Sequence, residues 1–356
     1  MILKGISKFG VPLTDQAKSR SNFIFKSSNQ LKVDVLHTFN TVCDTKTPWV
    51  STFETTIPRL IQTMNYHHEN STIQIDRQIK ETLQLLQQDS CKKLIALSQC
   101  NWSIQEALVK EVFPEAVNDI MNKTVVIPPP QPLLVKKRDI ELKMKDIHKE
   151  IRFIFVGRQF FRKGGRELIH VLAKIRKHFN VKFTIVSSLT FGDYATQTTI
   201  KDKEDMLKII EQNDDWITWI DALTNEEVLA LCKKSHVGLL PTWADTYGYS
   251  VLEMQASGCP VLTTNIRALP EINNDTCGWI CPIPRNKFGE ALYSTESSRK
   301  ILSETLEKEL EKSIVEICSK PEHIIERARN ALVKIKEEHD PLEYGRKLFD
   351  IYNGKG

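Results

Sequence analysis

The stretch VGLLPTWADTYGYSVLEMQASGCPVLTT, residues 237–264, decides the fold. It opens with a short apolar run typical of a buried strand, and Gly248 begins a helical segment that ends at Gly258. A second strand starts at Pro260. A strand, a loop, a helix and a further strand in this order indicate a parallel α/β sheet, whose ligands bind beyond the carboxyl ends of the strands.

The same stretch carries two carboxylates, Asp245 in the loop and Glu253 about one turn inside the helix. The first amides of a helix bind anions, and ionised carboxylates accept hydrogen bonds from vicinal hydroxyls. An anion held by the amides of Gly248, Tyr249 and Ser250 would therefore have a carboxylate on each side. This arrangement suits a diphosphate with a ribose at one end and a sugar at the other. The alternative is a charge at the helix N-terminus and a solvated glutamate.

A second motif, VGRQFFRKGG at residues 156–165, places Arg158 and Lys163 between a strand and the helix that follows Gly164 and Gly165. Two cations beside a helix N-terminus can neutralise a diphosphate. The lysine precedes the glycine pair and no Ser or Thr follows it, so the motif is not a Walker loop for magnesium-dependent phosphoryl transfer. The alternative interpretation is a solvated basic turn.

The rest of the chain continues the alternation of strands and helices. In the first half we expect a helix at 71–88 and strands at 33–36, 49–53, 93–97 and 124–127. In the second half we expect strands at 151–156, 181–186, 216–220, 237–240 and 260–263, helices at 167–177, 226–233 and 249–257, and further helices over 297–352. The proline-rich run at 128–132 can continue neither a strand nor a helix, so it separates two domains, 1–135 and 136–342.

Composition narrows the class of protein. The chain has 356 residues, 41% of them hydrophobic, and a net charge of +4, which is too small for a nucleic-acid binder. Its eight cysteines form no CxxC pair and are interpreted as buried thiols of a reducing compartment. Neither a leader nor a membrane-spanning run is recognisable, so we expect a cytoplasmic protein, with peripheral membrane contact left open.

The motifs resemble those of the retaining GT-B-fold glycosyltransferases called group 1, or family four. The likeness rests on the frame PTWADTYGYSVLEMQASGCPV and on VGR…RKGG, RALPEI and CGWICP, which together span most of residues 151–282. It implies an α/β fold of two Rossmann-like, doubly wound domains that face each other across a cleft. It also implies that the C-terminal helix, at about 343–356, packs back on the first domain.

The resemblance assigns roles as well. Arg158 and Lys163 would bind the diphosphate of a nucleotide sugar, Glu253 its ribose, and Asp245 the transferred sugar. The implied reaction is transfer, with retention, from a UDP- or GDP-linked donor to a glycan, lipid-linked or other hydroxyl acceptor in polysaccharide or glycoconjugate biosynthesis, which is EC 2.4 chemistry. Neither a metal nor a cofactor is implied.

The sequence departs from the family pattern in three places. Asp245 stands where the family usually has Glu, and Arg267–Ala268 occupy a turn that often carries two glycines. The first domain is shortened. It also lacks the glycine-rich loop of relatives, since no glycine occurs between Gly10 and Gly157. The shorter Asp is expected to alter which sugar fits.

Within the first domain, His37 and Glu54 follow predicted strands, where side chains reach a ligand cleft. We assign both to the catalytic site, with a structural histidine as the alternative for His37. Two other classes of protein stay open: a non-catalytic subunit that binds nucleotide sugars, and a dinucleotide oxidoreductase. The second would need a GxGxxG string after a strand, and the sequence has none.

Overall fold

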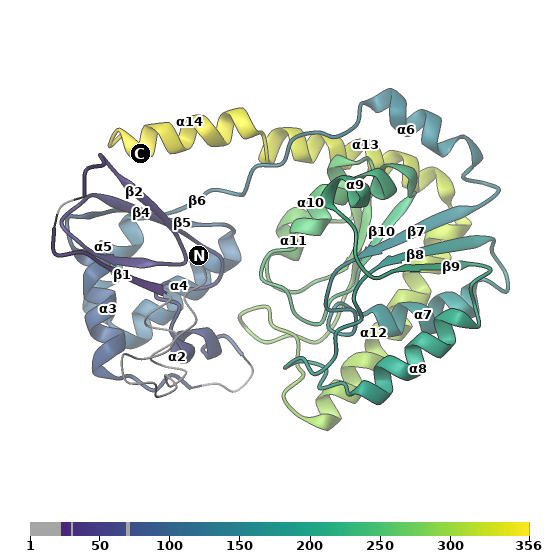
Figure 1. The fold of residues 1–356 in the computed structure, drawn as a ribbon, viewed down its shortest axis with the longest axis horizontal. Coiled ribbons are helices and arrows are strands. Elements are labelled where there is room, and N and C mark those ends of the chain that lie inside the picture. Colours follow the sequence, from purple (N-terminus) through teal and green to yellow (C-terminus); the bar gives the residue numbers. More distant parts are fainter. Residues whose placement is uncertain (1–22, 30, 69–71, 356) are drawn as a thin grey trace. The chain divides into compact units, whose positions relative to one another are not determined.

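The computed structural model describes residues 23–29, 31–68 and 72–355 (Figure 1). Contacts within the chain divide it into two units. Unit 1 runs to Pro129 and takes up the C-terminal segment from Leu342, and unit 2 is Pro130–Pro341. The strands of both units pair in parallel, as strands that alternate with helices do.

The sheet of unit 1 has the strand order β2-β4-β5-β6, and a separate pair joins β1 to β3. The strands are β1 (Ile24–Lys26), β2 (Leu36–Phe39), β3 (Val42–Asp44), β4 (Trp49–Phe53), β5 (Cys91–Ala96) and β6 (Thr124–Val126). The helices are α2 (Ile61–Asn65), α3 (Arg77–Gln87), α4 (Gln99–Val112), α5 (Val117–Asn122) and α14 (Pro341–Tyr352), with a 3₁₀ turn at Pro114–Ala116. Asp76 and Ser98 accept hydrogen bonds from the first amides of α3 and α4, which fixes where these helices begin.

The first predicted strand, 33–36, is wrong. β2 begins only at Leu36, whose amide donates to the carbonyl of Pro48 at 2.9 Å. Its neighbour β4 starts at Trp49, so residues 33–35 have no parallel neighbour in the described chain. A strand needs a partner for its amides and carbonyls, and β2 starts where that partner starts.

The last helix, α14, belongs to unit 1 although the chain reaches it from unit 2. Its apolar face, formed by Tyr344, Leu348 and Ile351, lies against β4 and β5 through Val50 and Ile95. Full burial of one large aliphatic side chain stabilises a fold by about 1.5–3 kcal/mol. The C-terminal helix is therefore an integral part of the unit 1 core.

Unit 2 is built on six parallel strands in the order β12-β11-β10-β7-β8-β9. They are β7 (Ile151–Val156), β8 (Val181–Val186), β9 (Ile217–Ile220), β10 (Val237–Leu240), β11 (Val261–Thr264) and β12 (Gly278–Cys281). The predicted bounds of β7, β8 and β10 are confirmed, β9 begins one residue later than predicted, and β11 lies one residue further along the chain at both ends. The strand β12 was not predicted.

The helices of unit 2 were predicted in part. They are α6 (Lys137–Lys143), α7 (Gly165–Ile175), α8 (Ile200–Glu211), α9 (Asn225–Lys234), α10 (Tyr249–Ala256), α11 (Leu269–Ile272), α12 (Glu296–Ser319) and α13 (Pro321–Glu338), with a 3₁₀ turn at Met144–Asp146. The helix α10, expected at 249–257, has the predicted start at Tyr249, and Gly258 in the left-handed region follows its end.

Two features of composition can be compared with the structure. All eight cysteines are free, and seven of them are buried, which agrees with the interpretation as thiols. Among the described residues, no helix is both long and apolar enough to cross a membrane.

Candidate functional site

The strand order of unit 2 places a topological switch between β7 and β10. From β7 the chain builds outward to β8 and β9, and it returns on the other side of β7 with β10, β11 and β12. The loops that follow two adjacent strands diverge at such a point and leave a crevice at their carboxyl ends. Both sequence motifs lie in these two loops, and the fold therefore brings them together.

The loop after β7 needs glycine at two positions because other parts of the site pass close to its backbone. A Cβ on Gly157 would lie 2.4 Å from Cδ of Lys163, so the stem of the lysine runs along the bare backbone. Gly164 has a φ of +78°, and a Cβ there would lie 2.3 Å from the carbonyl oxygen of Pro241. The glycines thus let Lys163 and the loop after β10 approach each other.

Hydrogen bonds hold the two loops together. The carbonyl of Arg162 accepts the amide of Trp243 at 2.8 Å and the hydroxyl of Thr242 at 3.2 Å. The Trp243 side chain is buried. The loop that carries Asp245 is therefore fixed relative to the loop that carries Lys163.

The ammonium of Lys163 and the carboxylate of Asp245 form an ion pair, with 2.9 Å between Nζ and Oδ2. Both side chains are largely buried, with 16% and 14% of their surface exposed. Burial by itself raises the pKa of a carboxyl group, but the charge and hydrogen bond of Lys163, together with the charge of Arg162 and the amide of Tyr247, outweigh it and lower the pKa of Asp245. Asp245 is thus held ionised, next to a cation.

A cavity of 610 Å³ opens at this point of unit 2. It brings together five predicted site residues: Arg158, Lys163, Asp245, Tyr249 and Ser250. The remaining lining residues are Val156, Gly157, Gln159, Thr190, Phe191, Gly192 and Asp193. A volume of this size lies in the range of ordinary ligand pockets, about 300–1,000 Å³.

The N-terminus of α10 borders the cavity. Gly248 is its N-cap with a φ of +97°, and a glycine has no side chain with which to cap the helix. The hydroxyl of Ser250 is buried and has no hydrogen-bond partner among the described residues. Helix amides and an unpaired hydroxyl are donors, so this end of the helix is suited to an anion.

Glu253 does not line the cavity, but it lies on the same face of α10 as Tyr249 and Ser250, four and three residues further along, respectively. Its half-buried carboxylate makes no ion pair or hydrogen bond in the described chain, and burial raises its pKa. Its surroundings therefore disfavour the charge of Glu253, whereas those of Asp245 stabilise it.

The loop after β8 also belongs to the site, and the sequence did not predict it. Thr190, Phe191, Gly192 and Asp193 line the cavity, and the hydroxyl of Thr190 donates to the carbonyl of Arg158 at 2.9 Å. Phe191 is 44% exposed and presents an apolar ring at the cavity. The missed signal was position: this segment follows a predicted strand next to β7, so it reaches the same edge of the sheet.

Residues 150–294 match the model of the family described as Glycosyl transferases group 1. This part of unit 2 is therefore similar to the group 1 glycosyltransferases. The matched range contains both motifs and every donor-site residue predicted from the sequence.

Relatives of this matched region are distant. An uncharacterized glycosyltransferase of Methanocaldococcus jannaschii is 26% identical over 137 residues, 38% of this chain and 33% of its own length. The glycogen synthase of Mycobacterium tuberculosis is 29% identical over 140 residues, 39% of this chain and 31% of its own length. The chain thus spans about a third of the length of these curated relatives.

Solved structures extend the likeness beyond the matched region. The Anabaena protein Alr3699/HepE in complex with UDP has a TM-score of 0.60 at 13% sequence identity, and the match covers 90% of this chain and 79% of that protein. At this identity the match shows the fold alone. The GT-B fold predicted from the sequence, with Rossmann-like α/β domains, is confirmed.

The two predicted catalytic residues outside the matched region lie at different levels of the unit 1 sheet. Glu54 follows the last residue of β4, as predicted, and forms an ion pair with Arg59 at 2.5 Å. The predicted position of His37 beyond a strand end is wrong, because His37 is the second residue of β2 and pairs with Val50. At about 3.3 Å per residue, four residues of β4 separate that level from Glu54, which is about 13 Å.

His37 has a structural environment. Its Nδ1 lies 2.5 Å from the hydroxyl of Tyr352 and its Nε2 lies 2.8 Å from the hydroxyl of Thr52. Burial lowers the pKa of the imidazole. The ring therefore joins α14 to β4, and the strand-end argument for a catalytic His37 no longer holds.

Proposed function

We propose that this protein is a retaining glycosyltransferase that moves a sugar from a UDP- or GDP-linked donor to a hydroxyl acceptor. One observation carries the proposal: a single cavity at the switch point of unit 2 contains Arg158, Lys163 and Asp245 at the N-terminus of α10. The likeness to a glycosyltransferase fold that has been solved with UDP supports a nucleotide-linked donor.

In this proposal the donor diphosphate binds to Arg158, Lys163 and the hydroxyl of Ser250. Negative charge grows on the leaving phosphate as the bond to the sugar breaks. Cations and hydroxyls fixed at that position therefore lower the activation barrier of transfer more than they strengthen substrate binding. Charge-assisted hydrogen bonds contribute about 1.5–3 kcal/mol each. Because the two cations supply this charge, we expect transfer to persist in the presence of EDTA.

Lys163 would contact both the donor diphosphate and Asp245, the carboxylate assigned to the transferred sugar. Its ammonium lies 2.9 Å from Asp245, and an incoming phosphate competes for the same cation. Asp245 then accepts hydrogen bonds from hydroxyls of the transferred sugar, as ionised carboxylates do with diols. Glu253, one turn further along α10, accepts the ribose hydroxyls.

Retention requires the acceptor hydroxyl to attack the face of the sugar from which the nucleoside diphosphate leaves, and it does not require a protein nucleophile. The protein contributes the position of the acceptor and the stabilisation of the leaving group. Glu54 remains the predicted polar contact on the unit 1 side. A glycan or a lipid-linked hydroxyl would serve as the acceptor, which places the reaction in polysaccharide or glycoconjugate biosynthesis.

A thermal-shift panel of UDP- and GDP-linked sugars tests the donor assignment. A ligand at 100 times its dissociation constant stabilises the folded state by about 2.7 kcal/mol, so the cognate donor should stand out clearly. The hit is then incubated with glycan and lipid-linked acceptors, and the anomeric configuration of the product is determined by NMR. An inverted product contradicts retention. Binding without transfer or donor hydrolysis favours the non-catalytic subunit.

A further inference from the structure

A second hollow lies on unit 2, away from the switch point, and we call it the linker hollow. It has a volume of 790 Å³ and lies between the segment that enters unit 2, the start of α6 and the outer face of α13. Its lining residues are Leu133, Leu134, Val135, Lys136, Lys137, Asp139, Arg329, Asn330, Leu332, Val333 and Lys336. None of them belongs to the donor cavity.

Most charged side chains of the linker hollow are cationic. The side chains of Lys136, Lys137 and Lys336 are exposed, and no carboxylate of the described residues pairs with any of them. The two other charged groups are already engaged: Asp139 accepts the amide of Lys136 at 2.7 Å, and Arg329 pairs with Glu141 at 3.1 Å. Three ammonium groups therefore surround the opening without anionic partners.

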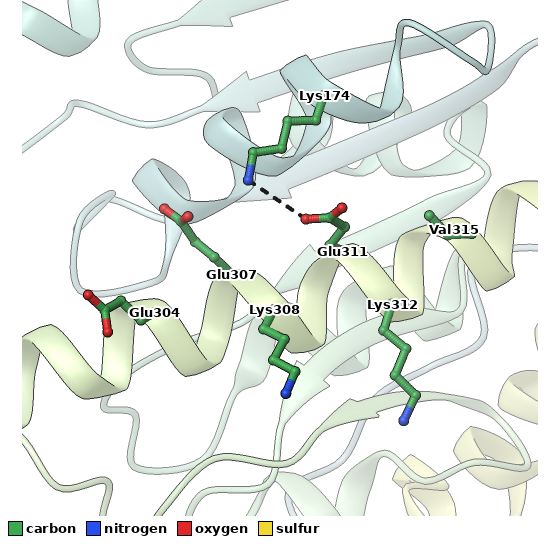
Figure 2. A pocket seen from close by; sticks show the side chains of 7 residues that line it. All are labelled: Lys174, Glu304, Glu307, Lys308, Glu311, Lys312 and Val315. Carbon is green, nitrogen blue, oxygen red and sulfur yellow. Dashed lines mark ion pairs between the residues drawn. The ribbon is translucent and has the colours of Figure 1, made fainter.

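A hollow of similar size between α7 and α12 contains cationic and anionic side chains in equal number (Figure 2). It is also lined by three lysines, Lys174, Lys308 and Lys312. Three glutamates, Glu304, Glu307 and Glu311, line the same hollow, and Lys174 pairs with Glu311 at 3.7 Å, whereas Lys308 and Lys312 point away from the glutamates (Figure 2). Its three lysines and three glutamates cancel in formal charge, whereas the linker hollow has an excess of cationic side chains, and this excess distinguishes the two hollows.

The floor of the linker hollow is apolar. Leu133 is 44% exposed and Val333 is 52% exposed, and both lie beside the lysines. The amide of Leu134 already donates to the carbonyl of Ala256 at 3.0 Å, which limits pairing of this segment with a peptide strand. Apolar surface next to unpaired cations complements a ligand that carries an anionic group on a hydrocarbon chain.

We propose that the linker hollow binds anionic phospholipid at a membrane surface. The phosphate of the headgroup meets Lys136, Lys137 and Lys336, and the upper part of an acyl chain covers Leu133 and Val333. Each lysine near an anionic surface contributes about 1 kcal/mol, or about fivefold in partition. This site is independent of the donor cavity, and it can fail or hold whatever the donor site does.

Vesicle flotation tests the proposal. The full chain is mixed with vesicles of phosphatidylglycerol and phosphatidylcholine, or of phosphatidylcholine alone, and the bound fraction is measured at several salt concentrations. We expect binding to the anionic vesicles only, weakening as salt rises. The K136A/K137A/K336A variant should lower the partition about a hundredfold.

The hollow in Figure 2 supplies a matched control. The K174A/K308A/K312A variant loses the same charge, and it should stay within about threefold of the unmodified chain because the three glutamates that line this hollow already cancel the formal charge of the lysines. Equal losses in both variants would reduce the effect to net charge and overturn the site. Absence of binding to anionic vesicles at low salt would overturn it as well.

Substitution of the apolar residues in the linker hollow distinguishes a lipid ligand from an acidic protein partner. Leu133→Ser with Val333→Ser should weaken vesicle binding at least about fivefold, since hydrocarbon contact is lost. If this variant binds vesicles as before, and soluble polyglutamate displaces the unmodified chain from them, the hollow is a docking site for acidic protein and the lipid proposal is wrong.

Discussion

Asp245 and Glu253 are eight residues apart, one before α10 and one inside it, and their surroundings shift their pKa values in opposite directions. Asp245 is paired with Lys163, which lowers its pKa. Glu253 is half-buried without a partner in the described chain, and burial raises its pKa. In the proposed donor site, one end is thus assembled before a ligand arrives, and the other end is completed only by the ligand. Charge preorganised at the reacting end favours the transition state, whereas an unsatisfied group favours binding.

The largest expected effect comes from removing both cations. The R158A/K163A variant should lose transfer by more than about a hundredfold, because two charge-assisted bonds of about 1.5–3 kcal/mol each disappear. Initial rates with the cognate donor measure this. A folded double variant with most of its activity would show that the diphosphate binds elsewhere.

The two single variants, Lys163→Ala and Arg158→Ala, should differ in their free energy of unfolding. Lys163→Ala leaves the largely buried Asp245 unpaired and should cost about 3 kcal/mol in urea unfolding, whereas Arg158→Ala removes an exposed side chain and should change stability little. Equal stability of the two variants would contradict a preassembled reacting end.

A smaller effect is expected for Asp245→Asn. Turnover should fall about a hundredfold at most, because one charged contact to the transferred sugar is lost. Affinity for the free nucleoside diphosphate should not fall, since that ligand lacks the sugar. Calorimetry with the diphosphate beside transfer rates decides this, and a parallel loss of affinity would place Asp245 at the phosphate.

Glu253→Gln should weaken nucleoside diphosphate binding about tenfold, which corresponds to about 1.4 kcal/mol. Without ligand the same variant should be more stable at neutral pH. The raised folded pKa means that Glu253 supports folding below its ordinary value of 4.5 and loses that contribution as pH rises through the folded pKa. The gain of the variant should therefore vanish in acid. Thermal unfolding at pH 4 and pH 7.5 tests it, and a variant less stable at neutral pH would point to a hidden partner.

The smallest expected effect is that of Phe191→Ala. Its exposed ring borders the cavity and offers a flat surface to a nucleobase, and stacking on an aromatic side chain contributes about 1–3 kcal/mol. Affinity for the nucleoside diphosphate should fall about fivefold, while affinity for inorganic pyrophosphate should not change. Phe191→Tyr serves as the conservative control. Equal losses for both ligands would place Phe191 next to the phosphates.

The sequence predicted unit 2 well because its signals are local. Gly248 and Gly258 delimit α10, and apolar runs delimit β7 and β10, so chemistry and backbone punctuation coincide. It could not predict that Lys163 and Asp245 form an ion pair, because that contact depends on β7 and β10 being neighbours. His37 was misplaced for a similar reason: the start of β2 is set by its partner strand, and no local residue marks it.

The placement of α14 has a consequence for engineering. Unit 2 is one uninterrupted stretch, Pro130–Pro341, so a gene fragment can encode it with a single start and stop. Unit 1 cannot be obtained by stopping at Pro129, because Val50 and Ile95 would lose the cover that Tyr344, Leu348 and Ile351 provide. Chimeras that exchange donor preference between relatives should therefore swap the interior segment and leave both ends of the recipient chain in place.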